Sequence, residues 1–246
     1  MKITVLGGSG AWPAADAACS GFLLEHDGYR LVLDLGYAAF PQLQKTITPA
    51  QVDAVLISHG HPDHCADLSP LLRARALAGN PPAPLPVYAL PGALDAVLAL
   101  DRPGMLDDAY LLRDFDAGDR LTIGPFTVET RLLPHWVPNA GMRLSAGGTA
   151  VAYTGDSGPS PDVAALARGT GLLIAEASYP HQVPPDSARF LTSARQAARQ
   201  AAQAGAARLL LTHLLPGTDP AVTLDAASQA FPGPIAIAET GVTLDL

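Results

Sequence analysis

The sequence predicts an α/β fold, formed as a single domain over residues 1–246. Short apolar runs alternate with segments of helical composition, and each half of the chain begins with strands and continues as strand–helix units. Hydrophobic residues make up 48% of the chain, which is enough for a sizeable core. Neither a Pro/Ser-rich linker nor a low-complexity segment interrupts it, so two similar halves of one domain are expected.

In the first half, a strand at 3–6 ends in the glycine-rich residues 7–10. No P-loop lysine follows these glycines, so a tight turn between strands is predicted. Asp27-Gly28 is a strong turn signal and predicts a hairpin between strands 20–26 and 30–35. Further strands are predicted at 52–57 and 87–90, with helices at 38–47, 68–78 and 92–100. Residues 101–119 lack a regular pattern and are interpreted as a lid over the functional site.

The second half repeats the scheme. Gly147-Gly148 predicts another hairpin, and Gly205 ends a helix. The predicted strands are 120–123, 126–133, 142–144, 149–154, 172–175, 208–212, 235–238 and 242–244, and the predicted helices are 162–168, 193–204 and 220–230.

Composition excludes several classes of protein. The net charge is −8 and no basic cluster occurs, which disfavours an extended nucleic-acid footprint but not a small anionic substrate. Two cysteines are too few for a disulfide framework, and Cys65 is interpreted as a packing residue rather than a metal ligand. Residues 1–8 resemble a first strand and not a signal peptide, and no apolar run has the length of a membrane span. A cytoplasmic protein without a membrane partner is expected.

One loop carries an unusual density of metal-binding side chains. The apolar run 55–57 is followed by Ser58 and then by His59-Gly60-His61-Pro62-Asp63-His64, which places three imidazoles and a carboxylate in six residues. Imidazolium ions so close together would repel one another, and buried neutral imidazoles would need partners. Neutral histidine nitrogen and carboxylate oxygen are ligands that divalent metals prefer, so this loop predicts a metal site.

Three further candidate ligands, His135, Asp156 and His213, each follow the end of an apolar strand. Open α/β sheets collect their chemistry at the ends of strands. Together with the loop, these residues make five histidines and two aspartates. One metal takes about four or five ligands, so seven ligands indicate two metals that share one of them.

The HxHxDH spacing, followed in order by His135, Asp156 and His213, resembles the metallo-β-lactamase superfamily over essentially the whole chain. The resemblance implies a four-layer αβ/βα sandwich with two metals at one end. It assigns His59, His61 and His135 to one metal and Asp63, His64 and His213 to the other, with Asp156 and a water bridging them. Asp63 and Asp156 are accordingly expected to be catalytic.

The resemblance also places Asp34, at the end of strand 30–35, behind the metal loop as a supporting carboxylate. Asp67 either orients a ligand histidine in the same way or is an ordinary carboxylate in the first turn of a helix. The metals are expected to be zinc, with manganese and iron as alternatives, because nitrogen and oxygen ligands serve all three. The His at position 61, where diiron reductases of the superfamily carry Glu, favours a hydrolase.

The segments 153–158, 175–178, 191–192 and 211–214 are similar to the ribonuclease Z and cyclic-phosphodiesterase branch. Two features depart from that branch. Only 20 residues separate His135 from Asp156, too few for the tRNA-binding arm of ribonuclease Z, which argues against a tRNA substrate. Phe190 also stands where the branch carries a catalytic histidine, so His181 and Glu176 are considered as the group that protonates the leaving group.

The predicted activity is hydrolysis by a water that the two metals activate. A phosphodiesterase acting on a small-molecule diester is the favoured hypothesis. Hydrolysis of an ester, thioester or lactone by the same nucleophile is the alternative, and a metal-bound scaffold that has lost catalysis is a third. The oligomeric state, a homodimer included, is left open.

Overall fold

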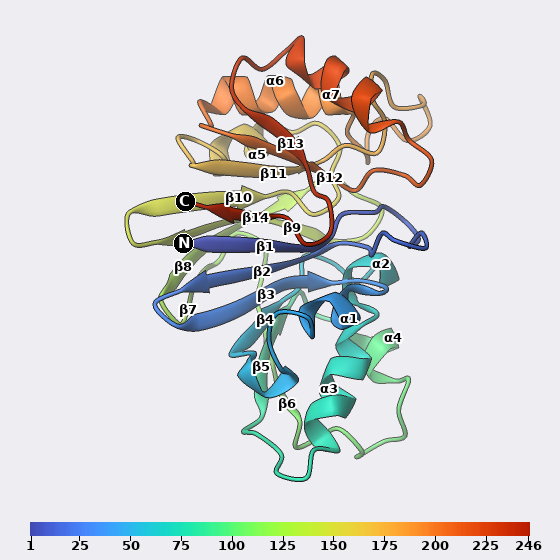
Figure 1. Cartoon of the computed structure of the whole chain (residues 1–246), viewed down its shortest axis with the longest axis vertical. Helices are drawn as coiled ribbons and strands as arrows, with labels where there is room; N and C mark the ends of the chain where they lie inside the picture. Colours follow the sequence, from blue (N-terminus) through green and yellow to red (C-terminus); the bar gives the residue numbers. More distant parts are fainter.

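Two seven-stranded sheets face each other in the computed structural model, which describes all residues 1–246 (Figure 1). The first sheet has the order β14 (Thr243–Asp245), β1 (Lys2–Gly7), β2 (Gly21–His26), β3 (Tyr29–Leu35), β4 (Ala54–Leu56), β5 (Leu85–Ala89) and β6 (Tyr110–Asp114). The second has the order β13 (Ile235–Ile237), β12 (Leu209–Thr212), β11 (Leu172–Glu176), β10 (Thr149–Tyr153), β9 (Asn139–Ala146), β8 (Phe126–Leu133) and β7 (Arg120–Ile123).

Helices cover the outer face of each sheet (Figure 1). The helices beside the first sheet are α1 (Ala39–Leu43), α2 (Pro62–Cys65), α3 (Leu68–Ala76) and α4 (Asp95–Leu98), with a short 3₁₀ turn at Pro49–Gln51. Those beside the second are α5 (Pro161–Leu166), α6 (Ala194–Ala204) and α7 (Pro220–Ser228). This arrangement confirms the predicted α/β class and the four-layer αβ/βα sandwich.

Three apolar clusters hold the layers together. The central cluster joins the two sheets, with Phe22 and Leu33 from the first sheet facing Phe126 and Met142 from the second. A second cluster lies between the first sheet and its helices, and a third lies between the second sheet and helices α5 to α7. Burial of apolar surface on both faces of each sheet is the main favourable contribution to this architecture.

Local signals account for several elements. Asp27 and Gly28 both have positive φ, 48° and 80°, as the two-residue turn of the predicted hairpin requires. Helix α6 begins at Ser193, whose hydroxyl accepts the Gln196 N–H in a capping box, and ends at Gly205 in the left-handed conformation. The helices α1 and α4 are shorter than the predicted helices at 38–47 and 92–100, since they have five and four residues.

The predicted lid at residues 101–119 is wrong. Within it, β6 pairs in parallel with β5 and becomes the edge of the first sheet. Leu106 is buried in the cluster beneath α3, and the guanidinium of Arg73 on α3 donates a hydrogen bond to the carboxylate of Asp101. The segment therefore extends the sheet and its helical layer. None of the helices combines the length and the apolar character that a membrane span requires.

The direction of the strands determines where the chemistry collects. Strands β3 and β4 run parallel, as do β10, β11 and β12, and β8 points the same way as β10 because both are antiparallel to β9. The carboxyl ends of these strands therefore share one edge of the sandwich. Loops at such an edge are where α/β sheets place their functional side chains.

Candidate metal centre

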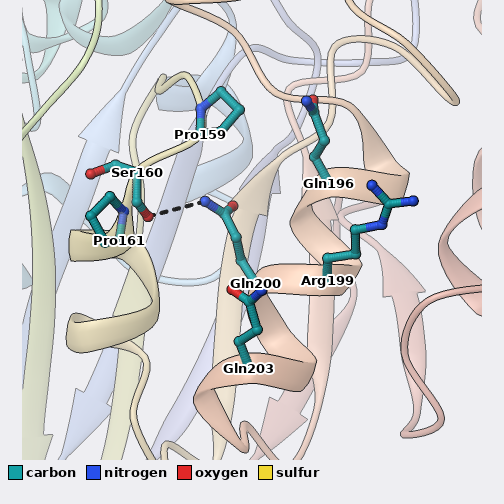
Figure 2. Close-up of a pocket in the computed structure, with 7 residues that line it drawn as sticks. All are labelled: Pro159, Ser160, Pro161, Gln196, Arg199, Gln200 and Gln203. Carbon is teal, nitrogen blue, oxygen red and sulfur yellow. Dashed lines mark hydrogen bonds between the residues drawn. The ribbon is translucent and has the colours of Figure 1, made fainter.

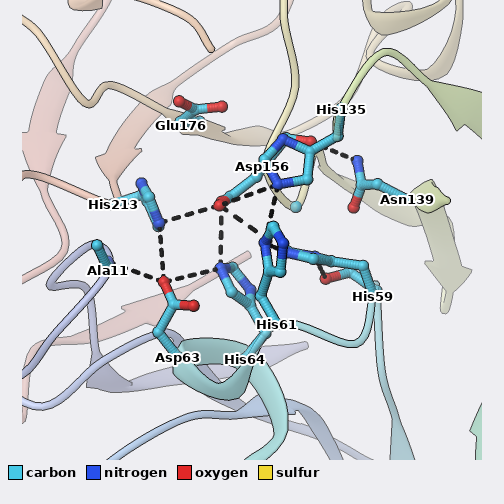
Figure 3. Close-up of polar contacts among 12 residues, drawn as sticks. Ala11, His59, His61, Asp63, His64, His135, Asn139, Asp156, Glu176 and His213 are labelled. Carbon is cyan, nitrogen blue, oxygen red and sulfur yellow. Dashed lines mark hydrogen bonds and ion pairs between the residues drawn. The ribbon is translucent and has the colours of Figure 1, made fainter. Parts of the chain in front are cut away.

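All seven predicted ligands meet at this edge (Figure 3). Their donor atoms form two groups of four, and within each group the atoms lie within 4.8 Å of one another. The first group is His59, His61, His135 and Asp156, and the second is Asp63, His64, Asp156 and His213. Asp156 belongs to both groups, which is the geometry of two neighbouring cation positions with one shared carboxylate.

Pro62 explains why one short loop supplies both groups. His61 has extended backbone, with φ −69° and ψ 141°, and caps helix α2, in which Pro62 is the first residue. Residues two apart in an extended segment point to the same side, so His59 and His61 both face the first group. After Pro62 the chain is helical, and Asp63 and His64 in that turn face the second group.

The first group is nearly closed to solvent. The His61 Nδ1 atom lies 3.1 Å from His59 Nε2 and 3.0 Å from His135 Nε2. The nearer oxygen of Asp156 lies 3.9 Å from His59 Nε2 and 3.8 Å from His135 Nε2. The side chains of His59, His135 and Asp156 are at most 4% exposed, whereas His61 is partly exposed, so access to this position comes from the side of His61.

The second group is fully buried and richer in carboxylate. His213 Nε2 lies 3.0 Å from an oxygen of Asp156 and 3.1 Å from Oδ2 of Asp63. His64 Nε2 lies 3.1 Å from the other oxygen of Asp156 and 3.6 Å from Asp63. The backbone N–H of Ala11 donates to Asp63 Oδ2 at 2.8 Å and holds that carboxylate in place.

Hydrogen bonds to the outer nitrogens fix the tautomers of two ligands directly. His64 Nδ1 donates to the carboxylate of Asp34 at 2.7 Å, and His135 Nδ1 donates to the carbonyl oxygen of Phe190 at 3.0 Å. A carbonyl or carboxylate oxygen only accepts, so each Nδ1 carries the proton. In the neutral ring the inner nitrogen then offers a lone pair to the centre.

Two more histidines are oriented through serine hydroxyls. His59 Nδ1 lies 3.0 Å from Ser58 Oγ, and His213 Nδ1 lies 2.9 Å from Ser178 Oγ. Each hydroxyl donates its own proton to a carboxylate, that of Asp34 or of Glu176, at 2.7 Å. Each serine therefore accepts from the imidazole, and the inner Nε2 atoms again face the centre as lone pairs.

The residues fit two divalent cations. His64 Nε2 and an oxygen of Asp156 face each other at 3.1 Å, are buried, and lack any hydrogen-bond partner. Two electron-pair donors in such a position require positive charge between them. Three histidines with a carboxylate, beside two histidines with two carboxylates, are ligand sets that zinc and similar ions accept.

The pKa shifts of the imidazoles show where the metal-free chain needs positive charge. Burial lowers the pKa of His59, His61 and His135, so these rings stay neutral. Burial acts in the same direction on His64 and His213, but the neighbouring carboxylates together outweigh it, Asp156 with Asp34 at His64 and Asp156 with Asp63 at His213. They raise the pKa of His64 well above its usual range and that of His213 to about 10. In the metal-free chain the imidazoles of His64 and His213 therefore carry protons at the position where a metal would bind.

Zinc binding should consequently release protons. Because the pKa values of His64 and His213 are raised, both rings are protonated at neutral pH in the metal-free chain, and a metal must displace these protons. We expect about one to two protons released per chain near pH 7, and an affinity that rises as the pH rises. Calorimetric titration of zinc in two buffers of different ionisation enthalpy measures this number, and a value of zero would contradict the assignment.

Asp34 lies behind the metal loop, where the sequence places it. Its carboxylate accepts from Ser58 N, Ser58 Oγ, His64 Nδ1 and Tyr153 OH, each at 2.7 Å. It ties the end of β3 to the loop after β4 and to β10 in the other sheet. Asp34 and His213 both have positive φ, 54° and 60°, so strained backbone accumulates at the centre.

Three other predicted residues have different surroundings. Two roles were considered for Asp67, and the structure excludes that of orienting a ligand histidine: Asp67 stands at the start of α3, and its carboxylate accepts the Phe40 N–H of α1 at 2.9 Å. His181 is exposed and bonded to Arg195 at 3.2 Å, which corrects the prediction that its loop brings it into the site. Cys65 is buried, with its thiol directed to the carbonyl of His61.

Glu176 lies beside the centre but reaches it only through Ser178. Burial and the neighbouring Asp156 carboxylate raise its pKa to about 8. Its oxygens accept from Ser157 N, Ser178 Oγ and Thr192 N, so they are occupied by groups of the chain. In this arrangement Glu176 positions His213 and does not face the space between the ligand groups (Figure 3).

The glycine-rich residues 7–10 are the part of the site that the sequence reasoning missed. A Cβ atom on Gly10 would lie 2.7 Å from His213 Nδ1, so only glycine allows this loop to pass the ligand. The next residue, Ala11, has φ 62° and supplies the N–H that holds Asp63. The glycine run itself was the available signal, because it follows a strand whose carboxyl end borders the centre.

The hollows near the centre differ in character. One of about 310 Å³ lies beside the ligand loops, between Gly60, Val137, Pro138 and the residues around Ala93. A larger one of about 430 Å³ lies between α5 and α6 and is lined by prolines, glutamines, Ser160 and Arg199 (Figure 2). Neither hollow is lined by one of the seven ligands. Gly60 stands between the ligands His59 and His61, and Val137 follows His135 by two residues, so the apolar hollow beside Gly60 is the better candidate for holding part of a substrate.

Comparison with known proteins agrees with this geometry. Residues 29–214 match the family described as the beta-lactamase superfamily domain. The probable metallo-hydrolase YhfI of Bacillus subtilis is 34% identical over 217 residues, covering 87% of each chain. A crystal structure of YhfI, described as a metallo-beta-lactamase fold protein, superimposes with a TM-score of 0.90 at 31% identity over 99% of both chains.

Ribonuclease Z of Mycobacterium marinum is 27% identical over 242 residues, which cover 88% of this chain and 87% of that enzyme. The short form of human tRNase Z shares the fold, with a TM-score of 0.80 at 22% identity over 100% of this chain and 99% of that one. With the sandwich and the two His/Asp groups at its edge, these matches show that the chain is a metallo-hydrolase of the metallo-β-lactamase superfamily.

Proposed function

We propose that the protein is a dinuclear zinc phosphodiesterase that acts on a small-molecule diester. The observation that carries the proposal is the pair of four-ligand groups that share Asp156. In such a centre the two ions would lower the pKa of a water and offset the charge that develops on a phosphoryl oxygen. Ribonuclease Z is among the relatives that cover most of the chain, and a ribonuclease hydrolyses the phosphodiester bonds of RNA.

The chain's own residues orient this centre. The carboxylate of Asp34 accepts hydrogen bonds from His64 and Ser58, and that of Glu176 accepts one from Ser178. These contacts keep the inner nitrogens of the ligand histidines directed toward the centre. Four of the five imidazoles have their outer nitrogen bonded, so the ligands are held before a metal arrives. Preorganised ligands of this kind reduce the reorganisation that catalysis would otherwise require.

Two features support a small substrate. Most of the residues between His135 and Asp156 belong to β9 and β10, which are regular strands of the second sheet, and the two strands are joined by the two-residue turn at Gly147 and Gly148. They provide no arm that could hold tRNA, and the net charge of −8 opposes binding of a long polyanion. The apolar hollow of about 310 Å³ beside Gly60 has the size of one substrate group.

The chain places no obvious proton donor beside the leaving group. Phe190 contributes a carbonyl to His135 and an aromatic ring to the rim, but no ionisable group. Since His181 is on the surface and Glu176 is engaged by the backbone, we infer a preference for diesters whose leaving groups are stable as anions. This would distinguish the protein from relatives with a histidine at the position of Phe190.

A substrate panel tests the proposal. We expect zinc-loaded protein to hydrolyse bis(p-nitrophenyl) phosphate at least about tenfold faster, in kcat/KM, than p-nitrophenyl acetate, thioesters or lactones. The leaving group is the same in the phosphate and the acetate, so the comparison isolates the reacting centre. Clear acyl turnover without phosphodiester turnover would favour the alternative esterase function. No turnover of any compound by a chain with two bound metals would favour a metal-stabilised scaffold.

A further inference from the structure

Exposed aromatic side chains lie beside the metal centre. The chain has only two tryptophans, and both are about half exposed, Trp12 at 53% and Trp136 at 51%. Trp12 follows the residue that holds Asp63, and Trp136 follows the ligand His135. Exposure of a large apolar indole ring to water is unfavourable in free energy. Exposed large aromatic surface beside a functional centre therefore commonly marks a binding site.

Trp136 and Phe190 form an aromatic surface in which the two rings partly overlap. The centroid of the Trp136 ring lies 5.1 Å from that of the His135 ring and 5.2 Å from that of the Phe190 ring. The planes of the Trp136 and Phe190 rings make an angle of 34°. The guanidinium of Arg189 lies 5.5 Å from the Phe190 ring centre. The aromatic surface therefore lies between the metal ligand His135 and the guanidinium of Arg189, which is one of only 15 basic side chains in the chain.

The surface is held rigidly in place. The carbonyl of Phe190 accepts from His135 Nδ1, which joins the rim directly to the centre. The N–H of Gly158 donates to the carbonyl of Pro134 at 2.8 Å, two residues before Trp136. A Cβ atom on Gly158 would lie 1.9 Å from the Arg189 carbonyl oxygen, so three segments pack here without space for a side chain.

We propose that the exposed ring of Trp136, packed against Phe190, is a stacking platform for a planar aromatic ring of the substrate. This proposal rests on the proposed function in one respect, because it takes the ring to be part of a substrate whose phosphate binds at the metals. Stacking of a ring on an exposed aromatic side chain contributes roughly a fivefold to 150-fold gain in affinity. A nucleobase and an aryl group share this chemistry.

Binding of product-like monoesters tests the platform without turnover. Trp12→Phe leaves Trp136 as the only tryptophan, and its fluorescence then reports contact at the platform. Zinc-loaded Trp12→Phe protein is titrated with AMP, phenyl phosphate and ribose 5-phosphate. We expect at least one of the two ring-bearing compounds to quench the fluorescence and to bind about tenfold more tightly than ribose 5-phosphate. Whether AMP or phenyl phosphate does so identifies a nucleobase or an aryl group as the occupant.

Variants of the full-length zinc-loaded protein separate stacking from folding. Trp136→Ala should remove the tenfold preference for the ring, measured calorimetrically, whereas Trp136→Phe should retain most of it. Leu132→Ala is a matched control, because Leu132 is 59% exposed on β8 and lies outside the platform. Zinc content is measured for each variant, so that a damaged centre is recognised.

Equal affinities for AMP, phenyl phosphate and ribose 5-phosphate, with no quenching of Trp136, would overturn the platform. Because these titrations involve no hydrolysis, they do not depend on the substrate panel. Ring-selective binding combined with no phosphodiester turnover would overturn the proposed function alone. Phosphodiester turnover combined with ring-independent binding would overturn the platform alone.

Discussion

Replacing Asp156 with asparagine should lower turnover by roughly three orders of magnitude and the zinc content from about two ions to about one per chain. Asp156 is the only side chain that belongs to both ligand groups. The amide keeps the shape of the carboxylate but places an N–H₂ group where one of two ligand oxygens was. Stopped assays with bis(p-nitrophenyl) phosphate and elemental analysis of the purified variant measure the two effects.

The matched control for Asp156→Asn is His181→Ala. His181 is exposed and bonded to Arg195, so its removal should change kcat by less than about twofold. A variant at Asp156 that retains both metals and normal turnover would show that Asp156 does not bridge them. A large loss in His181→Ala would restore His181 as a candidate for the general acid.

Asp34→Asn should weaken zinc binding by about 10–100-fold and lower the free energy of unfolding of the metal-free chain by about 3 kcal/mol or more. The Asp34 carboxylate accepts four hydrogen bonds from the chain, one of them from His64. An amide offers one accepting oxygen and turns an N–H₂ group toward the remaining donors. His64 then loses the partner that fixes its tautomer. Competition titration with a zinc chelator and denaturant unfolding measure the two quantities.

Tyr153→Phe is the control for this variant. It removes one of the four donors to Asp34 and leaves the carboxylate and its contact with His64 intact. We expect a loss of about 1 kcal/mol in unfolding free energy with nearly unchanged zinc affinity. Equal losses of zinc affinity in Asp34→Asn and Tyr153→Phe would mean that Asp34 has no specific effect on the ligand histidine.

The sequence was sufficient to place the ligands because their positions follow from simple topology. His135, Asp156 and His213 each come directly after an apolar strand, and parallel strands bring their carboxyl ends to one edge. The loop between His59 and His64 contains its own helix start at Pro62, so its geometry is local. The fold class and the positions of most strands along the chain followed from the same alternation of apolar runs and helical segments.

Features that depend on contacts between distant segments could not be predicted from the pattern. Strand β6 is mostly exposed and forms because β5 offers an unpaired edge, which the residues of β6 do not indicate. The carboxylate of Asp67 accepts the Phe40 N–H of α1 because the chain folds back across β3 and β4, although its sequence position beside the ligands left open a role in orienting a ligand histidine. Ala11 has no functional side chain at all, and its contribution is a backbone N–H in a left-handed conformation.

We infer that this chain binds two metal ions that share Asp156 as a ligand. Anomalous diffraction at the zinc edge, from crystals of the zinc-loaded protein, tests it most directly. The account predicts two peaks, one among His59, His61, His135 and Asp156, and one among Asp63, His64, Asp156 and His213. A single peak, or peaks away from these two groups, would contradict it.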